Sequence, residues 1–360
     1  MELQTNKYKI VNINTAAPRK PQANILIVYT GGTFGMVTDS KGSFVSFNFN
    51  EIIRKFPSLR NLELKITVIS FPQPIDSSDV NTENLIDIAY IIHENYQQYD
   101  GFVVLHGTDT MAYSASAISF LLDGLNKPVI FTGAQLPIGA IRTDARANLI
   151  TALEIASAKV DGKPVVPEVC VYFDYLLIRG NRVKKVRSSQ FAAFESENYP
   201  ILAKAGISLD YNMLSIKPHE PDVELKYFDK LDDNVAILKI FPGITQRFVE
   251  HFFKLPGLKG VIMETYGSGN APTEDWFLNL IKEACDQNII IFNVTQCNKG
   301  KVVQGRYRTS RKLAELGVLS GRDITTEAAI TKLMYLLGNE PDVDSVKEKL
   351  VINLRGEMES

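Results

Sequence analysis

Cysteine and histidine are scarce in this 360-residue chain, which has three cysteines and four histidines. Cys170, Cys285 and Cys297 are odd in number and far apart, and none belongs to a CxxC pair. Neither a zinc site nor a disulfide framework fits such spacing. The sequence therefore predicts no metal and no structural disulfide, and it favours a reducing, cytoplasmic location.

Long apolar runs and an excess of one charge are also missing. No window of eighteen apolar residues occurs, so we expect no membrane span. The 39 lysines and arginines nearly balance 41 aspartates and glutamates, so we expect no nucleic-acid partner and no anionic membrane surface. Residues 1–22 lack the apolar segment of a signal peptide, and we interpret them as a mobile extension. The alternative is an edge strand over residues 8–14 (YKIVNIN).

What is present is a globular composition, 45% hydrophobic and 22% charged. At about 150 residues per domain, the length indicates roughly two domains. Short β-branched runs alternate with amphipathic stretches, which is typical of an α/β fold with a mostly parallel sheet. The first half predicts strands at residues 25–29, 64–71, 102–106, 129–133 and 169–175, and helices at 82–97, 111–122 and 145–158. The second half predicts strands at residues 235–240, 260–264 and 289–293, and helices at 245–253, 276–286, 325–337 and 343–351.

A charged, proline-containing stretch separates the two halves. We expect an N-terminal extension (1–23), a larger domain with a mostly parallel, mixed sheet flanked by helices (24–214), a linker (215–233) and a smaller, Rossmann-like parallel α/β domain (234–360).

Two strands of the first half end in loops rich in threonine and glycine, at residues 30–33 (TGGT) and 106–110 (HGTDT). Ligands of open α/β sheets bind beyond the carboxyl ends of strands, so Thr33 and Thr108 are candidate nucleophiles that need an activating base. Each pattern alone has a plainer interpretation. TGGT is a common turn, Asp109 or Thr110 can cap the next helix, and His106 fits a hydrogen-bonded core histidine.

Taken together, seven motifs resemble the L-asparaginase family, and most closely its bacterial type I, cytoplasmic members. In chain order they are YTGGTFGM, DSSD, HGTDTMAYSASA, RGNR with a lysine soon after, YGSGNAP, NVTQC and NLRGE. The resemblance covers residues 24–358. It implies hydrolysis of L-asparagine to L-aspartate and ammonia without a metal or organic cofactor.

The resemblance also implies roles for single residues. Thr33 matches the nucleophilic threonine, and Thr108, Asp109 and Lys185 match the family's second catalytic set. Asp109 is also expected to receive the substrate's α-ammonium group.

The substrate's α-carboxylate is expected at Ser77 and Ser78. Because family sites are completed by a neighbouring subunit, the resemblance implies a homo-oligomer, an intimate dimer often paired into a tetramer. Asn270 is the candidate for the residue that reaches across.

Two departures from the family pattern stand out. Many relatives carry a tyrosine in the loop after the first threonine, where this chain has Ser43 followed by Phe44, and we still expect residues 36–47 to act as a lid. Some type I relatives bind asparagine at a second, allosteric pocket that uses an arginine and a threonine. Here Glu264 and Lys184 take those positions, while Cys297 is retained. We expect Lys184 to pair with Glu264, and asparagine to give no strong allosteric activation.

Three alternatives remain beside an asparaginase. One is the asparaginase-like subunit of a tRNA-dependent amidotransferase, which carries an additional N-terminal domain that about 23 residues could not supply. Another is a non-enzymatic amino-acid sensor, which would not need both threonines. The third is a glutaminase-asparaginase of broader specificity, because one methylene is worth only about 1–3 kcal/mol of discrimination.

Overall fold

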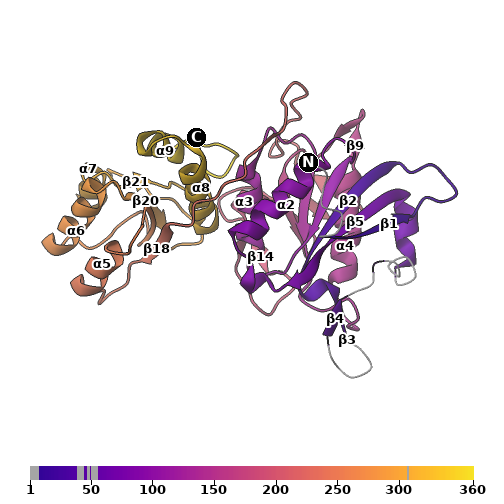
Figure 1. Ribbon diagram of the computed structural model, residues 1–360, viewed down its shortest axis with the longest axis horizontal. Coiled ribbons are helices and arrows are strands. Elements are labelled where there is room, and N and C mark those ends of the chain that lie inside the picture. The colour runs from indigo at the N-terminus through magenta and orange to yellow at the C-terminus, as the bar shows by residue number, and fades with distance from the viewer. Residues whose placement is uncertain (1–7, 39–43, 47–48, 50–55, 306–307) are drawn as a thin grey trace. The chain divides into compact units, whose positions relative to one another are not determined.

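The structure is a computed structural model that describes residues 8–38, 44–46, 49, 56–305 and 308–360. The chain divides into two compact units (Figure 1). The first comprises Met1–Ser196 and Pro200–Tyr227, and the second comprises Glu197–Tyr199 and Phe228–Ser360.

The first unit is built on a nine-stranded mixed sheet. Its strands, in spatial order, are β1 (Lys9–Asn14), β5 (Leu64–Ile75), β2 (Ala23–Gly31), β6 (Gly101–Leu105), β8 (Val129–Thr132), β11 (Val169–Phe173), β12 (Leu176–Arg179), β15 (Ala203–Ala205) and β16 (Leu209–Tyr211). The five strands from β5 to β11 are parallel, and the strands at both ends pair antiparallel. The expected α/β class is confirmed.

Helices supply the rest of the core of this unit. They are α2 (Thr82–Glu94), α3 (Met111–Leu121) and α4 (Ala145–Ser157). Strands β6, β8 and β11 are buried along their whole length, and Ile25, Leu26 and Ile27 of β2 are fully inaccessible. Such continuous apolar runs are what a parallel sheet covered on both faces requires.

The N-terminal segment and the stretch before the second unit contain strands that the sequence did not clearly predict. β1 pairs with β5 in full register from Lys9 to Asn14, so the edge-strand alternative is correct and a mobile segment there is wrong. Further along, β17 (Lys226–Tyr227) pairs with β7 (Leu122–Asp123).

Three more pairs form small hairpins: β3 (Met36–Thr38) with β4 (Phe44–Ser46), β9 (Lys159–Val160) with β10 (Lys163–Pro164), and β13 (Lys184–Lys185) with β14 (Phe194–Glu195).

The second unit has a four-stranded parallel sheet in the order β18 (Val235–Lys239), β19 (Gly260–Thr265), β20 (Ile290–Thr295) and β21 (Leu319–Ser320). Its helices are α5 (Gln246–Phe253), α6 (Asp275–Asp286), α7 (Arg308–Glu315), α8 (Thr326–Asn339) and α9 (Val343–Leu350). Val261 and Met263 of β19 pack in one apolar cluster with Phe277 of α6. Gly260 of the same strand lies against Leu333 of α8, so the sheet is covered on both faces (Figure 1).

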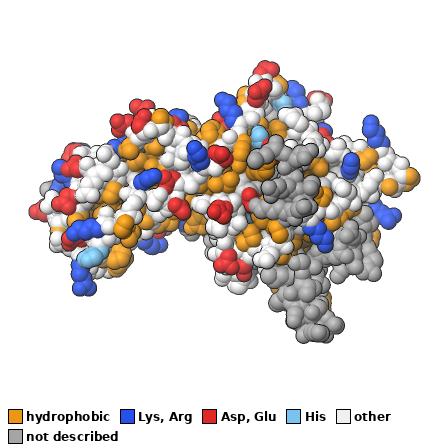
Figure 2. Space-filling view, in the orientation of Figure 1, with side chains coloured by type: hydrophobic (Ala, Val, Ile, Leu, Met, Phe, Trp, Pro, Cys, Tyr) orange, Lys and Arg blue, Asp and Glu red, His pale blue; other side chains and the backbone are white. Residues whose placement is uncertain are grey.

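Charged side chains of both signs are interspersed on the face seen in Figure 2. This mixture agrees with the formal net charge of −2. Among the helices that the structure describes, none has the length and apolar character needed to cross a membrane.

Candidate active site

The carboxyl ends of β5, β2 and β6 meet at one edge of the large sheet, because these strands are parallel neighbours. Thr33 follows β2, Ser77 and Ser78 follow β5, and Thr108 and Asp109 follow β6. Candidate residues from three distant parts of the sequence therefore lie at the edge of the sheet where α/β proteins bind ligands.

Two glycines allow the loops at this edge to touch. A Cβ on Gly32 would lie 2.6 Å from the Cα of Gly107, and a Cβ on Gly107 would lie 2.5 Å from Ser77 Oγ. Gly32 also has a φ of +77°, a conformation that side chains disfavour. Glycine at both positions is thus a steric requirement of the site.

Hydrogen bonds from the β6 loop hold Ser77 in place. The Asp109 N–H donates to Ser77 Oγ at 3.3 Å, and Thr110 Oγ1 donates to the Ser77 carbonyl at 2.6 Å. Thr110 occupies the cap position of α3 but makes no side-chain capping bond. The expected cap by Asp109 or Thr110 is therefore wrong, because each side chain is engaged elsewhere in the site.

Ser78 lies beside Ser77 in the short 3₁₀ helix Ser77–Asp79. Asp76 caps this helix, since its Oδ1 accepts from both Ser78 N and Ser78 Oγ at 3.0 Å. Ser77 is buried and Ser78 is exposed. Only the Ser78 hydroxyl thus faces solvent, while the Ser77 hydroxyl lies against the backbone N–H of Asp109.

Lys185 connects the residues that the resemblance assigns to the second catalytic set. Its Nζ donates to Thr108 Oγ1 at 2.8 Å and to Asp109 Oδ1 at 2.6 Å. The lysine reaches the site from the hairpin formed by β13 and β14, which is far from β6 in sequence. Its side chain is 16% exposed and that of Asp109 is 64% exposed, so the lysine is sheltered while the carboxylate faces solvent. The structure brings together Thr108, Asp109 and Lys185.

Thr33 begins the short 3₁₀ helix Thr33–Gly35 directly after Gly32. The next residue, Phe34, is fully buried and anchors this turn. Gly35 lies against the ring of Tyr29, whose burial raises its pKa to about 12. The expected tyrosine replacement, Ser43, lies outside the described residues, as does the side chain of Phe44. The lid stays a prediction.

His106 is a core histidine. Its Nδ1 contacts the Gly107 carbonyl at 2.7 Å and its Nε2 contacts Ser114 Oγ at 2.9 Å. The carbonyl can only accept, so Nδ1 carries the proton and Nε2 accepts from the serine. Complete burial lowers the pKa of His106 to about 4. Both ring nitrogens are occupied, and a role as catalytic base is excluded.

Gln135 is a site residue that the sequence reasoning missed. It follows β8, the next parallel strand after β6, and its Oε1 accepts from Thr108 Oγ1 at 3.3 Å. The rule that placed the other loops at this edge could have found it, because β8 ends there too. Its loop also begins with a Thr-Gly pair, Thr132-Gly133, but no second threonine that could act as a nucleophile follows directly, so the sequence did not mark Gln135 as a candidate.

Asn270 lies in the second unit, in the turn between β19 and α6. Its backbone N and O both bond to Tyr266 at 2.9 Å. Two residues of the NVTQC motif support this turn: Thr295 Oγ1 donates to the Gly267 carbonyl at 2.6 Å, and Asn293 Nδ2 donates to the Gly269 carbonyl at 3.3 Å. The turn is therefore held rigidly within its own unit.

Glu264 has partners for both carboxylate oxygens within the second unit. Lys239 Nζ lies 3.4 Å from Oε2, and Thr326 Oγ1 donates to Oε1 at 2.6 Å. Lys184, which the sequence named as a partner of Glu264, belongs to the first unit, and its pairing with Glu264 stays a prediction. The absence of strong allosteric activation stays a prediction.

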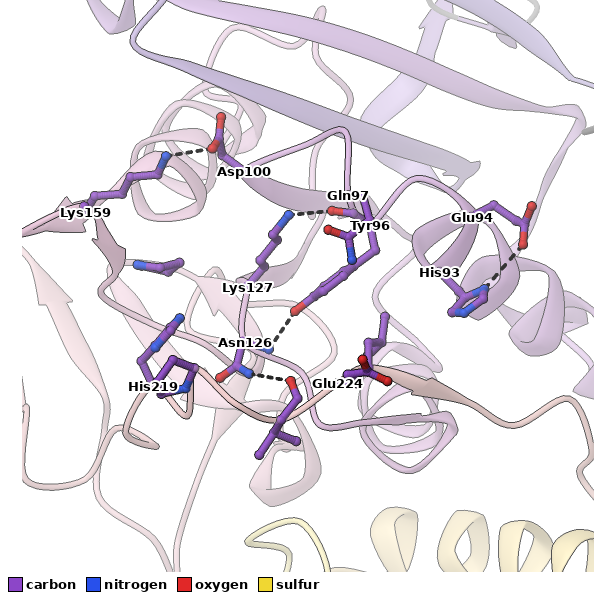
Figure 3. Close-up of a pocket in the computed structure, with 15 residues that line it drawn as sticks. His93, Glu94, Tyr96, Gln97, Asp100, Asn126, Lys127, Lys159, His219 and Glu224 are labelled. Carbon is purple, nitrogen blue, oxygen red and sulfur yellow. Dashed lines mark hydrogen bonds and ion pairs between the residues drawn. The ribbon is translucent and has the colours of Figure 1, made fainter.

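A hollow of about 730 Å³ in the first unit contains none of the predicted site residues (Figure 3). Its charged groups are largely satisfied. Lys159 pairs with Asp100 at 2.7 Å, and Lys127 donates to the carbonyls of Tyr96 and Tyr99.

In the described parts of the chain, no cluster of three or more histidine, cysteine, aspartate or glutamate side chains could hold a metal ion.

Two protein-family models match this chain. The model of the N-terminal asparaginase domain matches residues 24–216, and the model of the glutaminase/asparaginase C-terminal domain matches residues 234–350. This chain belongs to the asparaginase family. The resemblance carried by the seven motifs is confirmed.

Individual relatives agree with this assignment. The chain is 40% identical to L-asparaginase 1 of Escherichia coli (strain K12), over 93% of this chain and 98% of the relative. The crystal structure of L-asparaginase I from Vibrio cholerae is similar with a TM-score of 0.85 and 38% identity, covering 94% of this chain and 99% of that one. The structure of the thermostable L-asparaginase from Thermococcus kodakarensis is also similar, with a TM-score of 0.85 and 31% identity, covering 94% of this chain and 99% of that one.

Proposed function

We propose that this protein is an L-asparaginase that hydrolyses L-asparagine to L-aspartate and ammonia, with Thr33 as the nucleophile. The observation that carries the proposal is the double hydrogen bond of Lys185 Nζ to Thr108 Oγ1 and Asp109 Oδ1. It assembles a polar set at the same edge as Thr33, where a hydroxyl needs activation to attack an amide.

The substrate's backbone groups would bind at the rim. Asp109 exposes a carboxylate that can pair with the α-ammonium group. Ser77 Oγ accepts from the Asp109 N–H and can donate its own proton to the α-carboxylate, whereas the Ser78 hydroxyl, which donates to Asp76 in this structure, would turn to the α-carboxylate when substrate binds. Charged groups at both ends would orient the substrate so that its side-chain amide reaches Thr33.

The chemistry follows from these placements. Thr33 Oγ attacks the amide carbon, the C–N bond breaks, and the hydroxyl proton leaves with the nitrogen as ammonia. Water then cleaves the aspartyl ester and releases aspartate. The N–H groups of Gly32 and Asp109 are already bonded, to the Ile75 carbonyl and Ser77 Oγ, so the neighbouring N–H groups of Thr33 and Thr108 would stabilise the oxyanion.

A homo-oligomer and a cytoplasmic location are parts of the same proposal. Asn270, on its rigid turn, is the residue we expect to complete a neighbouring subunit's site. All three cysteines are free thiols, which suits a reducing compartment. A preference for glutamine, or a place in an amidotransferase, would give the same fold with a different product ratio or acceptor.

The test is ammonia release by the purified protein across titrations of asparagine and of glutamine. Thr33→Ala and Lys185→Met should each lower kcat by at least about a hundredfold with the fold intact. Lys282→Met is the matched control, because Lys282 forms only an exposed pair with Asp286 and should leave turnover unchanged. Near-normal turnover by either site variant would refute the mechanism, and faster turnover of glutamine would reassign the substrate.

A further inference from the structure

The hydroxyl proton of Thr108 needs an acceptor other than Lys185. A lysine ammonium has three donors and no acceptor, so Thr108 Oγ1 must accept from Nζ in their 2.8 Å bond. The hydroxyl can still donate once, and Gln135 Oε1 lies 3.3 Å away. The direction of the Thr108 proton therefore depends on the orientation of the Gln135 amide.

That orientation is fixed by the other end of the amide. Gln135 Nε2 donates to the Gln190 carbonyl at 2.9 Å and lies 3.5 Å from the Ser188 carbonyl. The reversed amide would point its oxygen at a carbonyl oxygen, where two acceptors repel, and would aim donors at Thr108. Oε1 is consequently the end that faces the threonine.

The backbone of Gln135 is also anchored. Its N–H donates to both carboxylate oxygens of Asp144, and the next N–H, of Leu136, donates to Asp144 Oδ1. The 2%-exposed Asn148 bonds both Asp144 Oδ2 and the Gly133 carbonyl, and so ties the loop to α4. A side chain on such a support keeps its direction without help from a substrate.

We propose that Gln135 is a positioning residue that turns the Thr108 proton away from the reacting atoms. Thr108 Oγ1 accepts from Lys185 through one lone pair and donates its proton to Gln135. Its second lone pair remains available to accept a hydrogen bond from the attacking hydroxyl or water. Gln135 does not touch the substrate in this role. The inference rests on the proposed function, because it assigns Thr108 to the catalytic set.

The test is a double-mutant cycle on asparagine hydrolysis with Gln135→Met, which keeps the length of the side chain and removes its hydrogen bonds. We expect kcat to fall about tenfold or more while KM changes less than about twofold. In a chain that already carries Thr108→Val, Gln135→Met should have little further effect, because its partner is gone.

The matched control is Gln97→Met, an exposed glutamine of the same unit in the hollow of Figure 3, which should leave kcat unchanged. Provided that the wild type releases ammonia, an unchanged kcat in Gln135→Met would overturn the inference. So would a fall in kcat from Gln135→Met that is equally large in the wild-type background and in the Thr108→Val background. If the wild type releases none, the proposed function fails instead. The same cycle on the melting temperature then decides the inference without substrate, since additive shifts would contradict the Gln135–Thr108 coupling.

Discussion

Two polar residues at the end of β6 show how environment decides a residue's role. His106 and Thr108 are two positions apart. Both ring nitrogens of His106 form hydrogen bonds inside the core, whereas Thr108 Oγ1 lies between Lys185 and Gln135. The sequence already favoured a core role for His106, because it ends an apolar run. It could not show which partner orients Thr108, since Gln135 is 27 residues away.

The buried His106 makes stability depend on pH. Its pKa is about 4 in the folded chain, against an ordinary value of 6.5, because burial disfavours the charged ring. Between these values the unfolded chain binds more protons than the folded one, so stability is complete above pH 6.5 and falls as the pH drops toward 4. The loss amounts to about 3 kcal/mol. Urea unfolding between pH 7 and pH 4 should show this slope in the wild type and a weaker one in His106→Gln; equal slopes would exclude His106 as the cause.

At the scale of elements, the central strands and the longer helices followed from sequence pattern, while the short strands and the contacts between distant segments did not. The run at residues 25–29 and the amphipathic stretch from Thr82 predict β2 and α2, because local periodicity reports burial directly. β1 pairs with β5 as an edge strand, which is the second of two interpretations of YKIVNIN, beside a mobile extension. The contact of Thr110 with Ser77 joins two loops, so a cap was the simpler local inference. Placing the threonine loops at one edge needed only the parallel order of the strands.

The glycine contacts at this edge should be intolerant of a methyl group. Gly32→Ala introduces both a disfavoured φ of +77° and a clash with the backbone of Gly107, so we expect at least a tenfold loss of asparagine turnover and a lower melting temperature. Gly162→Ala is the control, because Gly162 has a φ of +76° and nothing within 4 Å of an added Cβ. It should lose only the roughly 1–2 kcal/mol of a left-handed conformation and keep full activity. Equal activity losses in the two variants would argue against the loop contact.

At the scale of the molecule, the motifs are shared between the two units. The first unit holds Thr33 and the Lys185 cluster, and the second holds Asn270 on a turn supported by Asn293 and Thr295. Family resemblance could assign Asn270 a role across subunits, but no local pattern specifies an assembly, because the interface lies between copies.

Oligomerisation is therefore a prediction of its own. Activity should require at least a dimer, since a site that borrows Asn270 from a neighbour is incomplete in a monomer. Light scattering coupled to the ammonia assay over a dilution series should show specific activity falling as the dimer dissociates. Asn270→Ala should weaken turnover while the dimer persists, and a fully active monomer would refute the shared site.

The central claim is that Thr33 forms a covalent bond with the substrate, and rapid-quench mass spectrometry tests it most directly. After mixing with excess asparagine and quenching in acid, intact protein should gain the mass of one aspartyl group, and a peptide containing Thr33 should carry it. Thr33→Ala should gain nothing under the same conditions, while Lys282→Met should behave as the wild type. A wild-type adduct on another residue, or an adduct that persists in Thr33→Ala, would contradict the account.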